Sequence, residues 1–153
     1  MPTGRSLKFT PSEIGDYWYA SRIPTWEFNM HEVRVIAAGG ERVYFNSLNR
    51  LQPADVNGRE DVYQWEAPGT GSCEDEESPG FNEDAGGCVT LISSGTDVRD
   101  SEFVDASADG RDVFFLTGES LVSWDPGQID LYDARAGGGL PAPPAPPVGC
   151  DPS

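Results

Sequence analysis

The stretch RVYFNSLNRLQPADVNGREDVY at residues 42–63 decides the fold, because the chain repeats its pattern as DVFFLTGESLVSWDPGQIDLY at residues 112–132. Identical residues recur at an offset of 70 positions: Val43 and Val113, Phe45 and Phe115, Leu51 and Leu121, Asp55 and Asp125. One deletion then aligns residues 61–63 with residues 130–132. Self-similarity at a fixed offset is typical of repeat architectures, in which each unit buries its apolar face against the next.

Short strands surround both copies of the pattern. Each unit begins with a strand, a Gly-containing turn and a second strand, at residues 33–45 and 103–115. A loop and a third strand follow, at residues 61–65 in the first unit and 130–133 in the second. Residues 88–93 add a fourth strand to the first unit only. No segment keeps a 3.6-residue apolar period, so we expect almost no helix.

A unit of four short antiparallel strands with frequent turns is typical of a propeller blade. The sequence therefore predicts an all-β fold of two antiparallel propeller-like blades, the second of them incomplete. The expected segments are an aromatic-rich edge segment (1–31), a first repeat with an insert bracketed by cysteines (32–95), an incomplete second repeat (96–139) and a Pro-rich tail or linker (140–153). Strand alternation predicts that seven large side chains divide between buried faces: Tyr44, Phe45, Val62, Leu91, Val113, Phe115 and Leu131.

Composition excludes some functions. The formal net charge of −16 argues against nucleic acid as a partner, because a duplex would repel this surface. No stretch approaches the roughly 18 apolar residues that a membrane span needs. No apolar segment of a signal peptide follows the first residues, so the chain is either cytoplasmic or a piece of a longer exported chain. The Pro-rich end and the start without a leader favour the second alternative.

Five aromatic residues crowd the first segment: Tyr17, Trp18, Tyr19, Trp26 and Phe28. We expect them to cover an open edge or end of the repeat stack. The alternative is an aromatic platform for a ligand such as a carbohydrate. Trp65 and Trp124 lie on or beside repeat strands, which indicates core or inter-blade packing.

The loop DVNGRED at residues 55–61 carries oxygen ligands at spacings that suit Ca²⁺. Asp55, Asn57 and Asp61 would supply side-chain oxygens, and Arg59 a backbone carbonyl. The loop lacks the twelfth-position Glu and the flanking helices of an EF-hand. A second, weaker site would use Asp125 and Asp130, since this copy is shorter and loses the Asn. The alternative is that Asp55 and Asn57 form Asx-turns while Asp61 anchors the next strand.

Cys73 and Cys88 bracket an acidic insert whose two ends abut strands. An antiparallel hairpin would bring these sulfurs together, so the sequence predicts a disulfide and an oxidising compartment. Reduced thiols are the alternative, and the single His in the chain argues against a zinc site. Cys150 is left over and would pair with a cysteine elsewhere. The acidic insert itself indicates a solvated loop rather than a cation trap.

Catalytic motifs are weak in this chain. His31 is the only His, and no Gly-x-Ser-x-Gly turn or phosphate-binding Gly loop occurs. A glycosidase would need two carboxylates about 5–9 Å apart in a cleft. The chain has 26 acidic residues, so such a pair is conceivable, but the sequence singles none out.

The second unit resembles a known repeat. Ser-Ala-Asp-Gly at residues 107–110 precedes the Val-Phe-Phe strand at 113–115, and Asp-Leu-Tyr-Asp follows at 130–133. This order is similar to the TolB-type β-propeller repeat, in which Ser-Pro-Asp-Gly precedes a β-branched and aromatic strand and then Asp-Ile-Tyr. Residues 32–139 also resemble the C-terminal blades of uncharacterised actinobacterial surface proteins. The first unit departs from the pattern, with Ala-Gly-Gly at residues 38–40. The resemblance implies a fold and says little about function, because propellers host many activities.

The expected function is a non-enzymatic extracellular or cell-surface module, structural or binding, stabilised by calcium. The alternative is a fragment of a catalytic propeller, carbohydrate-active or peptidase-associated, whose active site lies partly outside this chain. Acids gathered at the inner ends of neighbouring blades would favour the enzyme, and acids confined to outer loops the binding module. Expected partners are a protein or carbohydrate at the cell surface, or further copies that pair through open sheet edges.

Overall fold

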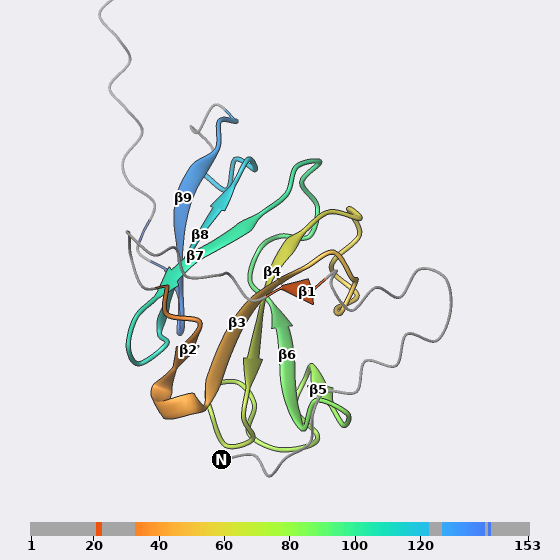
Figure 1. Cartoon of the computed structure of the whole chain (residues 1–153), viewed down its shortest axis with the longest axis vertical. Helices are drawn as coiled ribbons and strands as arrows, with labels where there is room; N and C mark the ends of the chain where they lie inside the picture. Colours follow the sequence, from red (N-terminus) through yellow and green to blue (C-terminus); the bar gives the residue numbers. More distant parts are fainter. Residues whose placement is uncertain (1–20, 23–32, 123–126, 140, 142–153) are drawn as a thin grey trace, which may run out of the picture.

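Nine strands form two antiparallel sheets in the computed structural model, which describes residues 21–22, 33–122, 127–139 and 141 (Figure 1). Sheet one has six strands: β1 (Ser21–Arg22), β2 (Ile36–Ala37), β3 (Arg42–Ser47), β4 (Asp61–Glu66), β5 (Phe81–Asn82) and β6 (Gly87–Leu91). Sheet two has three strands: β7 (Glu102–Ala106), β8 (Asp112–Thr117) and β9 (Asp130–Arg135). The helical content of the described residues is one 3₁₀ turn at Ala38–Gly40, so the all-β prediction is confirmed.

Strand order follows the predicted repeat. In sheet one the order is β1-β3-β4-β6-β5, and β2 also pairs with β3. In sheet two the order is β7-β8-β9. β7, β8 and β9 therefore correspond to β2, β3 and β4, and β6 has no counterpart among the described residues. This arrangement is consistent with one complete and one incomplete propeller-like blade.

The two units share their strand register. Phe45 lies opposite Tyr63 in sheet one, and Phe115 lies opposite Tyr132 at the corresponding place in sheet two. Each of these tyrosine hydroxyls accepts a hydrogen bond of 3.3 Å from a loop amide, that of Leu51 in the first unit and its repeat equivalent Leu121 in the second. The structure thus confirms the alignment of the two copies.

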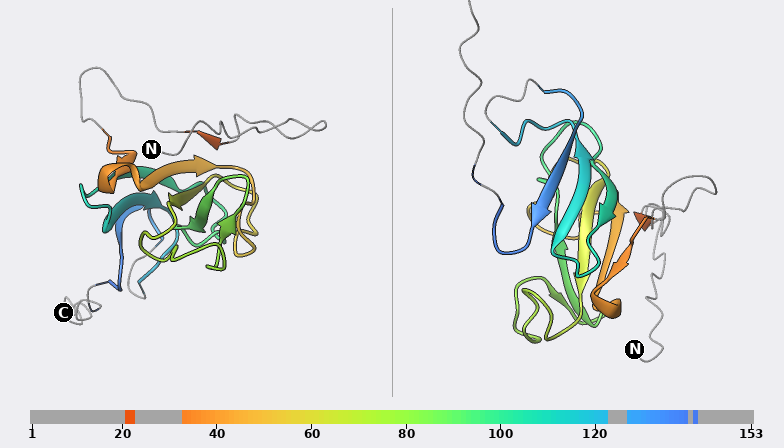
Figure 2. Two further views of the ribbon diagram at one scale, coloured as in Figure 1. Left: turned by 90° about the horizontal axis from the view of Figure 1, so that it is seen from below. Right: turned by 90° about the vertical axis from the view of Figure 1, so that its left-hand side faces the viewer.

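The sheets stack face to face, with sheet two in front of sheet one in the right-hand view of Figure 2. The inner face of sheet one consists of Arg42, Tyr44, Asn46, Val62, Gln64 and Glu66. The inner face of sheet two consists of Phe103, Val113, Phe115, Tyr132 and Ala134. Apolar members of both faces form one core, in which the rings of Tyr44 and Phe103 stack with centroids 5.3 Å apart. Burial of each large side chain contributes about 1.5–3 kcal/mol.

Burial departs from the sequence prediction at one position. Tyr44, Val62, Val113 and Phe115 are buried, and Phe45 and Leu91 are half-buried: these side chains lie on the predicted faces. Leu131, however, is 58% exposed. It points away from sheet one, and strand alternation alone does not say whether a second neighbour covers that side.

Part of the first segment pairs with sheet one. Ser21 and Arg22 lie opposite Ser47 and Asn46 of β3, so these two residues pair with one edge of sheet one. The aromatic residues from Tyr17 to Phe28 lie outside the described residues. No described helix is long and apolar enough to cross a bilayer.

Candidate functional site

The loop between β3 and β4 brings Asp55 and Asp61 together and buries both side chains. Their exposed fractions are 2% and 1%. The loop that follows β6 packs on them, since the amide of Val56 donates to the carbonyl of Gly95 at 2.9 Å. A Cβ at Gly95 would lie 2.6 Å from the Cα of Asp55, and the backbone there has a φ of +71°. Only glycine fits this close approach without strain.

Hydroxyl groups hold one oxygen of each buried carboxylate. The Tyr63 hydroxyl donates to Oδ2 of Asp55 at 2.5 Å. The Ser93 hydroxyl donates to Oδ1 of Asp61 at 2.6 Å, and the Val62 amide donates to Ser93 in turn at 3.0 Å. These bonds tie the loop to β4 and to the loop that follows β6, so both carboxylates have a structural role.

Burial raises the pKa of Asp61, because the charged carboxylate loses hydration there. The nearby charge of Asp55 raises this pKa further, while Ser93, Asn57 and the Gly95 amide lower it. Neither Oδ2 of Asp61 nor Nδ2 of Asn57 has a partner at good hydrogen-bond geometry, although both atoms are buried. This unsatisfied pair is the unusual feature of the loop.

The remaining predicted ligands lie in the turn of the loop and near the start of β9. Oδ1 of Asn57 accepts a hydrogen bond of 2.8 Å from the Arg59 amide, which is the predicted Asx-turn. Asp130 begins β9 as Asp61 begins β4, but Asp125 lies outside the described residues. No group of three or more His, Cys, Asp or Glu side chains in the described part of the chain is arranged to hold a metal ion. A cation here would therefore depend on Asn57 and backbone oxygens.

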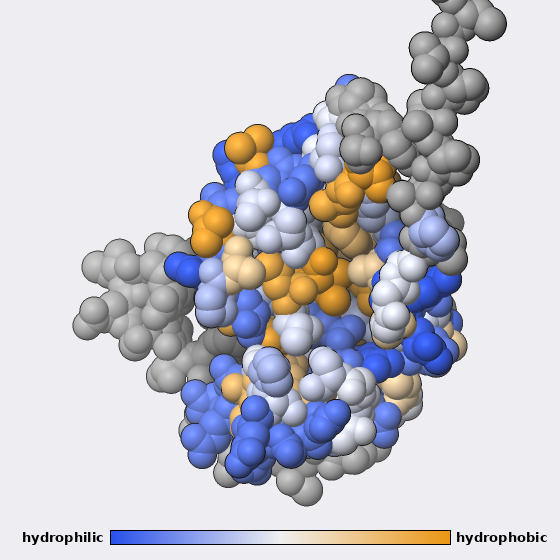
Figure 3. Space-filling model, turned by 180° about the vertical axis from the view of Figure 1, so that it is seen from behind, coloured by the Kyte–Doolittle hydropathy of each residue, from blue (hydrophilic) through white to orange (hydrophobic). Residues whose placement is uncertain are grey.

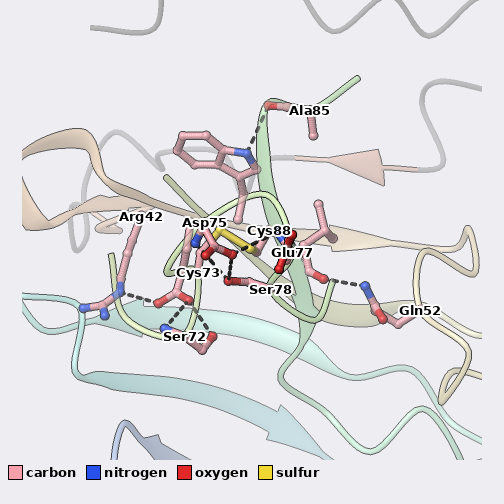
Figure 4. The surroundings of a disulfide bond; sticks show 12 residues. Arg42, Gln52, Ser72, Cys73, Asp75, Glu77, Ser78, Ala85 and Cys88 are labelled. Atoms are coloured by element: carbon pink, nitrogen blue, oxygen red, sulfur yellow. Dashed lines mark hydrogen bonds and ion pairs between the residues drawn. A yellow bond between two sulfur atoms is a disulfide. The ribbon is translucent and has the colours of Figure 1, made fainter. Parts of the chain in front are cut away.

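The predicted disulfide between Cys73 and Cys88 is present, with a Cα–Cα distance of 5.5 Å (Figure 4). Both cysteines are fully buried. The six acids of the insert are exposed: Glu74, Asp75, Glu76, Glu77, Glu83 and Asp84. Asp75 accepts from the Glu77 amide at 2.9 Å, so it organises its own turn. The disulfide is compatible with an extracellular location, and Cys150 lies outside the described residues.

Polar side chains on the inner face of sheet one bind the backbone of sheet two. Arg42 forms an ion pair with Glu66 at 2.9 Å and donates to the carbonyl of Asp109 at 2.8 Å. The Tyr44 hydroxyl donates to the carbonyl of Gly110 at 3.0 Å. Gly110 has a φ of +69°, and a Cβ there would lie 2.7 Å from both Arg42 and Tyr44. The Asp-Gly turn of the second unit is therefore fitted to the first unit.

Further contacts extend this connection along the interface. Asn46 accepts a hydrogen bond of 3.0 Å from the Phe103 amide, and Arg34 donates to the carbonyl of Ala106 at 2.7 Å. Burial raises the pKa of Tyr44 to about 12. The sequence pattern did not single out these connecting residues in advance. A signal was present, since Arg42, Tyr44 and Asn46 alternate along one strand and so share a face.

A cavity of about 150 Å³ opens between the two sheets. Its lining residues come from both units: Arg42, Gln64, Glu66, Ile92, Gly110, Arg111, Val113, Ala134, Arg135 and Ala136. Hydrophobic surface is exposed in the middle of the molecule when it is seen from behind (Figure 3). Glu66 is the one acid in the lining. Its Oε1 accepts from Arg42, and its Oε2 accepts from the amide and hydroxyl of Ser72 at 3.0 and 2.8 Å.

No family model, curated protein or solved structure matches the chain.

Proposed function

We propose that the chain is a non-enzymatic structural and binding module of two repeat units similar to TolB-type propeller blades, and that it works outside the cell or at its surface. The observation that carries this proposal is that polar residues on the inner face of sheet one bind the second unit. Arg42, Tyr44 and Asn46 all bind the backbone of the second unit, so the polar groups between the sheets hold the units together.

The distribution of acids supports binding rather than hydrolysis. Glycoside hydrolysis needs two carboxylates across a cleft, and Glu66 is the one acid among the described residues that line the inter-sheet cavity. Glu66 is 2% exposed and already neutralised by Arg42. The six acids of the insert lie in an exposed loop instead. Exposed acids in an outer loop are the arrangement expected of a binding module.

Parallel binding and turnover assays test the proposal. The purified protein would be applied to glycan and peptide arrays, and each retained ligand would be incubated with protein and analysed by mass spectrometry. We expect retained ligands to be recovered unchanged. If the wild-type protein cleaved a retained ligand and the Glu66→Gln variant did not, the proposal would be overturned in favour of a hydrolase fragment.

Calcium stabilisation of the Asp55–Asp61 loop is a second proposal, and it rests on a separate observation. Oδ2 of Asp61 is buried beside a second buried carboxylate and has no hydrogen bond of good geometry, although Asn57 and the Gly95 amide lie close enough to lower the Asp61 pKa. Ca²⁺ would satisfy this oxygen and relieve the repulsion between the two acids. Asp55, Asn57 and Asp61 would hold it with the carbonyl of Arg59, and the site near Asp130 would be weaker.

A calcium-dependent melting curve tests this second proposal. A ligand that binds only the folded state stabilises it by about 2.7 kcal/mol at a hundredfold excess over Kd. We expect millimolar Ca²⁺ to raise the Tm of wild-type protein and of the control Asp75→Asn, whose change lies in the exposed insert. Asp61→Asn should abolish the rise, although its amide oxygen still accepts from Ser93. Equal melting with and without Ca²⁺ in the wild type leaves the loop as a purely structural turn.

A further inference from the structure

β9 has one strand neighbour where its counterpart β4 has two. β4 pairs with β3 on one side and with β6 on the other. Within the described residues, β9 pairs with β8 alone. The cavity lined by Ala134, Arg135 and Ala136 lies beside this strand and faces Ile92 of the first unit. No strand of the described residues therefore occupies, in the second unit, the position that β6 fills in the first, and this position is the vacant place.

Backbone hydrogen bonds fix which groups of β9 face the vacant place. The Ala136 amide donates to the carbonyl of Arg111 at 2.8 Å, toward β8. Its equivalent in the first unit is the Ala67 amide, which donates to Glu41 at 2.9 Å. Residues alternate in direction along an antiparallel strand. The backbone groups of Asp133 and the amide of Arg135 therefore point to the outer edge, as those of Gln64 and Glu66 point to β6. The Arg135 carbonyl already accepts a hydrogen bond of 3.2 Å from the Gly138 amide.

The first unit shows which side chains such an edge accepts. In β6, Val89 lies opposite Trp65 and Thr90 lies opposite Gln64. By the repeat, the counterpart of Val89 would lie opposite Ala134 and turn into the cavity, over Ile92. The counterpart of Ile92 would cover Leu131, which is 58% exposed. An occupant therefore needs apolar residues at these positions.

The charge of Arg111 sets a further requirement for the occupant at one end of the vacant place. Arg111 lines the cavity, is exposed, and makes no salt bridge with a described residue. It lies on the cavity side of β8 because Val113, two residues on, is a core residue. The occupant residue opposite Ala136 would face it, and an acidic side chain there would complement its charge in a chain of net charge −16.

We propose that the outer edge of β9 binds an extended peptide segment of a partner, antiparallel to β9, with an acidic residue, a Val and a Leu at alternate positions facing the cavity. This inference names the class of partner for the proposed binding module, so it rests on that proposal and not on the calcium loop. Edge pairing gives affinity through main-chain hydrogen bonds, and the cavity gives specificity through alternate side chains.

The test uses a capped peptide, Glu-Ser-Val-Thr-Leu-Ile-Ser, which follows residues 87–93 with a Glu in place of Gly87 and a Ser in place of Cys88. Amide hydrogen exchange by NMR gives a residue-by-residue readout. At saturating peptide we expect exchange to slow at least about tenfold at Asp133 and Arg135 and to change little at Ala134, whose amide faces β8. A peptide that merely adsorbs would not produce this alternation.

Matched variants test the edge. Asp133→Pro removes the outward amide and is tolerated at an edge, while Asp133→Ala keeps the amide. We expect at least about tenfold weaker binding with Pro and less than about threefold with Ala, by fluorescence anisotropy. Should Asp133→Pro fail to fold, Arg111→Glu replaces it. This exposed change should weaken binding about fivefold, and the matched change of another exposed arginine, Arg50→Glu, should leave it unchanged.

Three outcomes overturn the inference. The first is that the peptide does not bind, and the second is that amide exchange slows at Asp133, Ala134 and Arg135 alike. The third is that exchange at Asp133 and Arg135 is slow without peptide while the protein forms a dimer, which would assign the edge to a second copy. Each of these leaves the non-enzymatic proposal standing. Cleavage of a retained ligand would instead remove that proposal and leave the peptide edge intact.

Discussion

The same ion-pair position occurs in both units, with opposite charges and different surroundings. In sheet one, Arg42 on β3 pairs with Glu66 on β4, and both residues are buried under the turn of the second unit. In sheet two, Asp112 on β8 pairs with Arg135 on β9 at 2.5 Å, but these side chains are 26% and 39% exposed. The repeat thus keeps the geometry, while neighbouring structure decides what the pair contributes to stability.

The largest expected difference in the free energy of unfolding concerns the phenylalanine that both units have at the same repeat position. Phe115 is 3% exposed in the core, whereas its equivalent Phe45 is half-buried and stacks on Tyr63. Phe115→Ala should lower the free energy of unfolding by about 3–5 kcal/mol, and Phe45→Ala by clearly less. Urea unfolding followed by tryptophan fluorescence measures both. Equal losses would mean that the outer side of sheet one is as tightly packed as the inter-sheet core.

Loss of the buried ion pair should rank next. Arg42→Ala leaves Glu66 buried without its cation, and breaking a buried pair costs about 3–5 kcal/mol. Arg135→Ala breaks the exposed pair, which should contribute less than about 1 kcal/mol. Urea unfolding of the two variants gives the comparison. If Arg135→Ala were as damaging as Arg42→Ala, another part of the protein would have to cover the outer side of sheet two.

The disulfide belongs to the first unit alone and offers a third comparison. Closing a loop of about 15 residues stabilises a protein by about 3 kcal/mol in the chain-entropy account. Reduction should therefore lower the Tm, and hydrogen exchange should speed up most around residues 73–88 and least in β8. The experiment uses a Cys150→Ser background, so that the tail cysteine cannot exchange. An unchanged Tm on reduction would show that hydrogen bonds such as Trp65 to Ala85 already hold the insert.

The features that the sequence predicted are local or repeated ones. The strands at 42–47 and 112–117 follow from alternation within a few residues, and the register follows from identical spacing in both copies. The Cys73–Cys88 bond follows from the antiparallel hairpin of β4 and β6, since Cys73 lies in the insert that connects them and Cys88 lies in β6. These predictions need no knowledge of how the two units pack together.

The features that the sequence did not predict depend on contacts between the units. Arg42 and Asp109 are 67 positions apart, and only the stacking of the sheets brings them together. Leu131 was expected on a buried face because alternation gives its side of the strand but not the neighbour on that side. Sequence spacing predicted the ligands of the Asp55–Asp61 loop. It did not predict the donors that hold two of their oxygens, because Tyr63 comes from β4 and Ser93 from the loop that follows β6.

The smallest expected effect concerns one hydroxyl at the interface of the two units. Tyr44 donates to Gly110, and its equivalent in the second unit is Phe114, which lacks this group. Tyr44→Phe should cost only about 1 kcal/mol at neutral pH, the typical value of one hydrogen bond.

Measurements at alkaline pH separate the wild-type protein from Tyr44→Phe more clearly. Burial raises the pKa of Tyr44 from 10.0 to about 12, because the folded state disfavours the charged phenolate. Between these two values the unfolded state has lost more protons than the folded state, so stability falls as pH rises from about 10 to 12. Tyr44→Phe lacks this group, and its stability should fall less steeply over the same range. Urea unfolding at pH 9, 10 and 11 provides the slopes, with absorbance near 295 nm as a check on phenolate formation. Parallel slopes for the two proteins would mean that Tyr44 ionises as freely when folded as when unfolded, and that the inter-sheet contact opens to water.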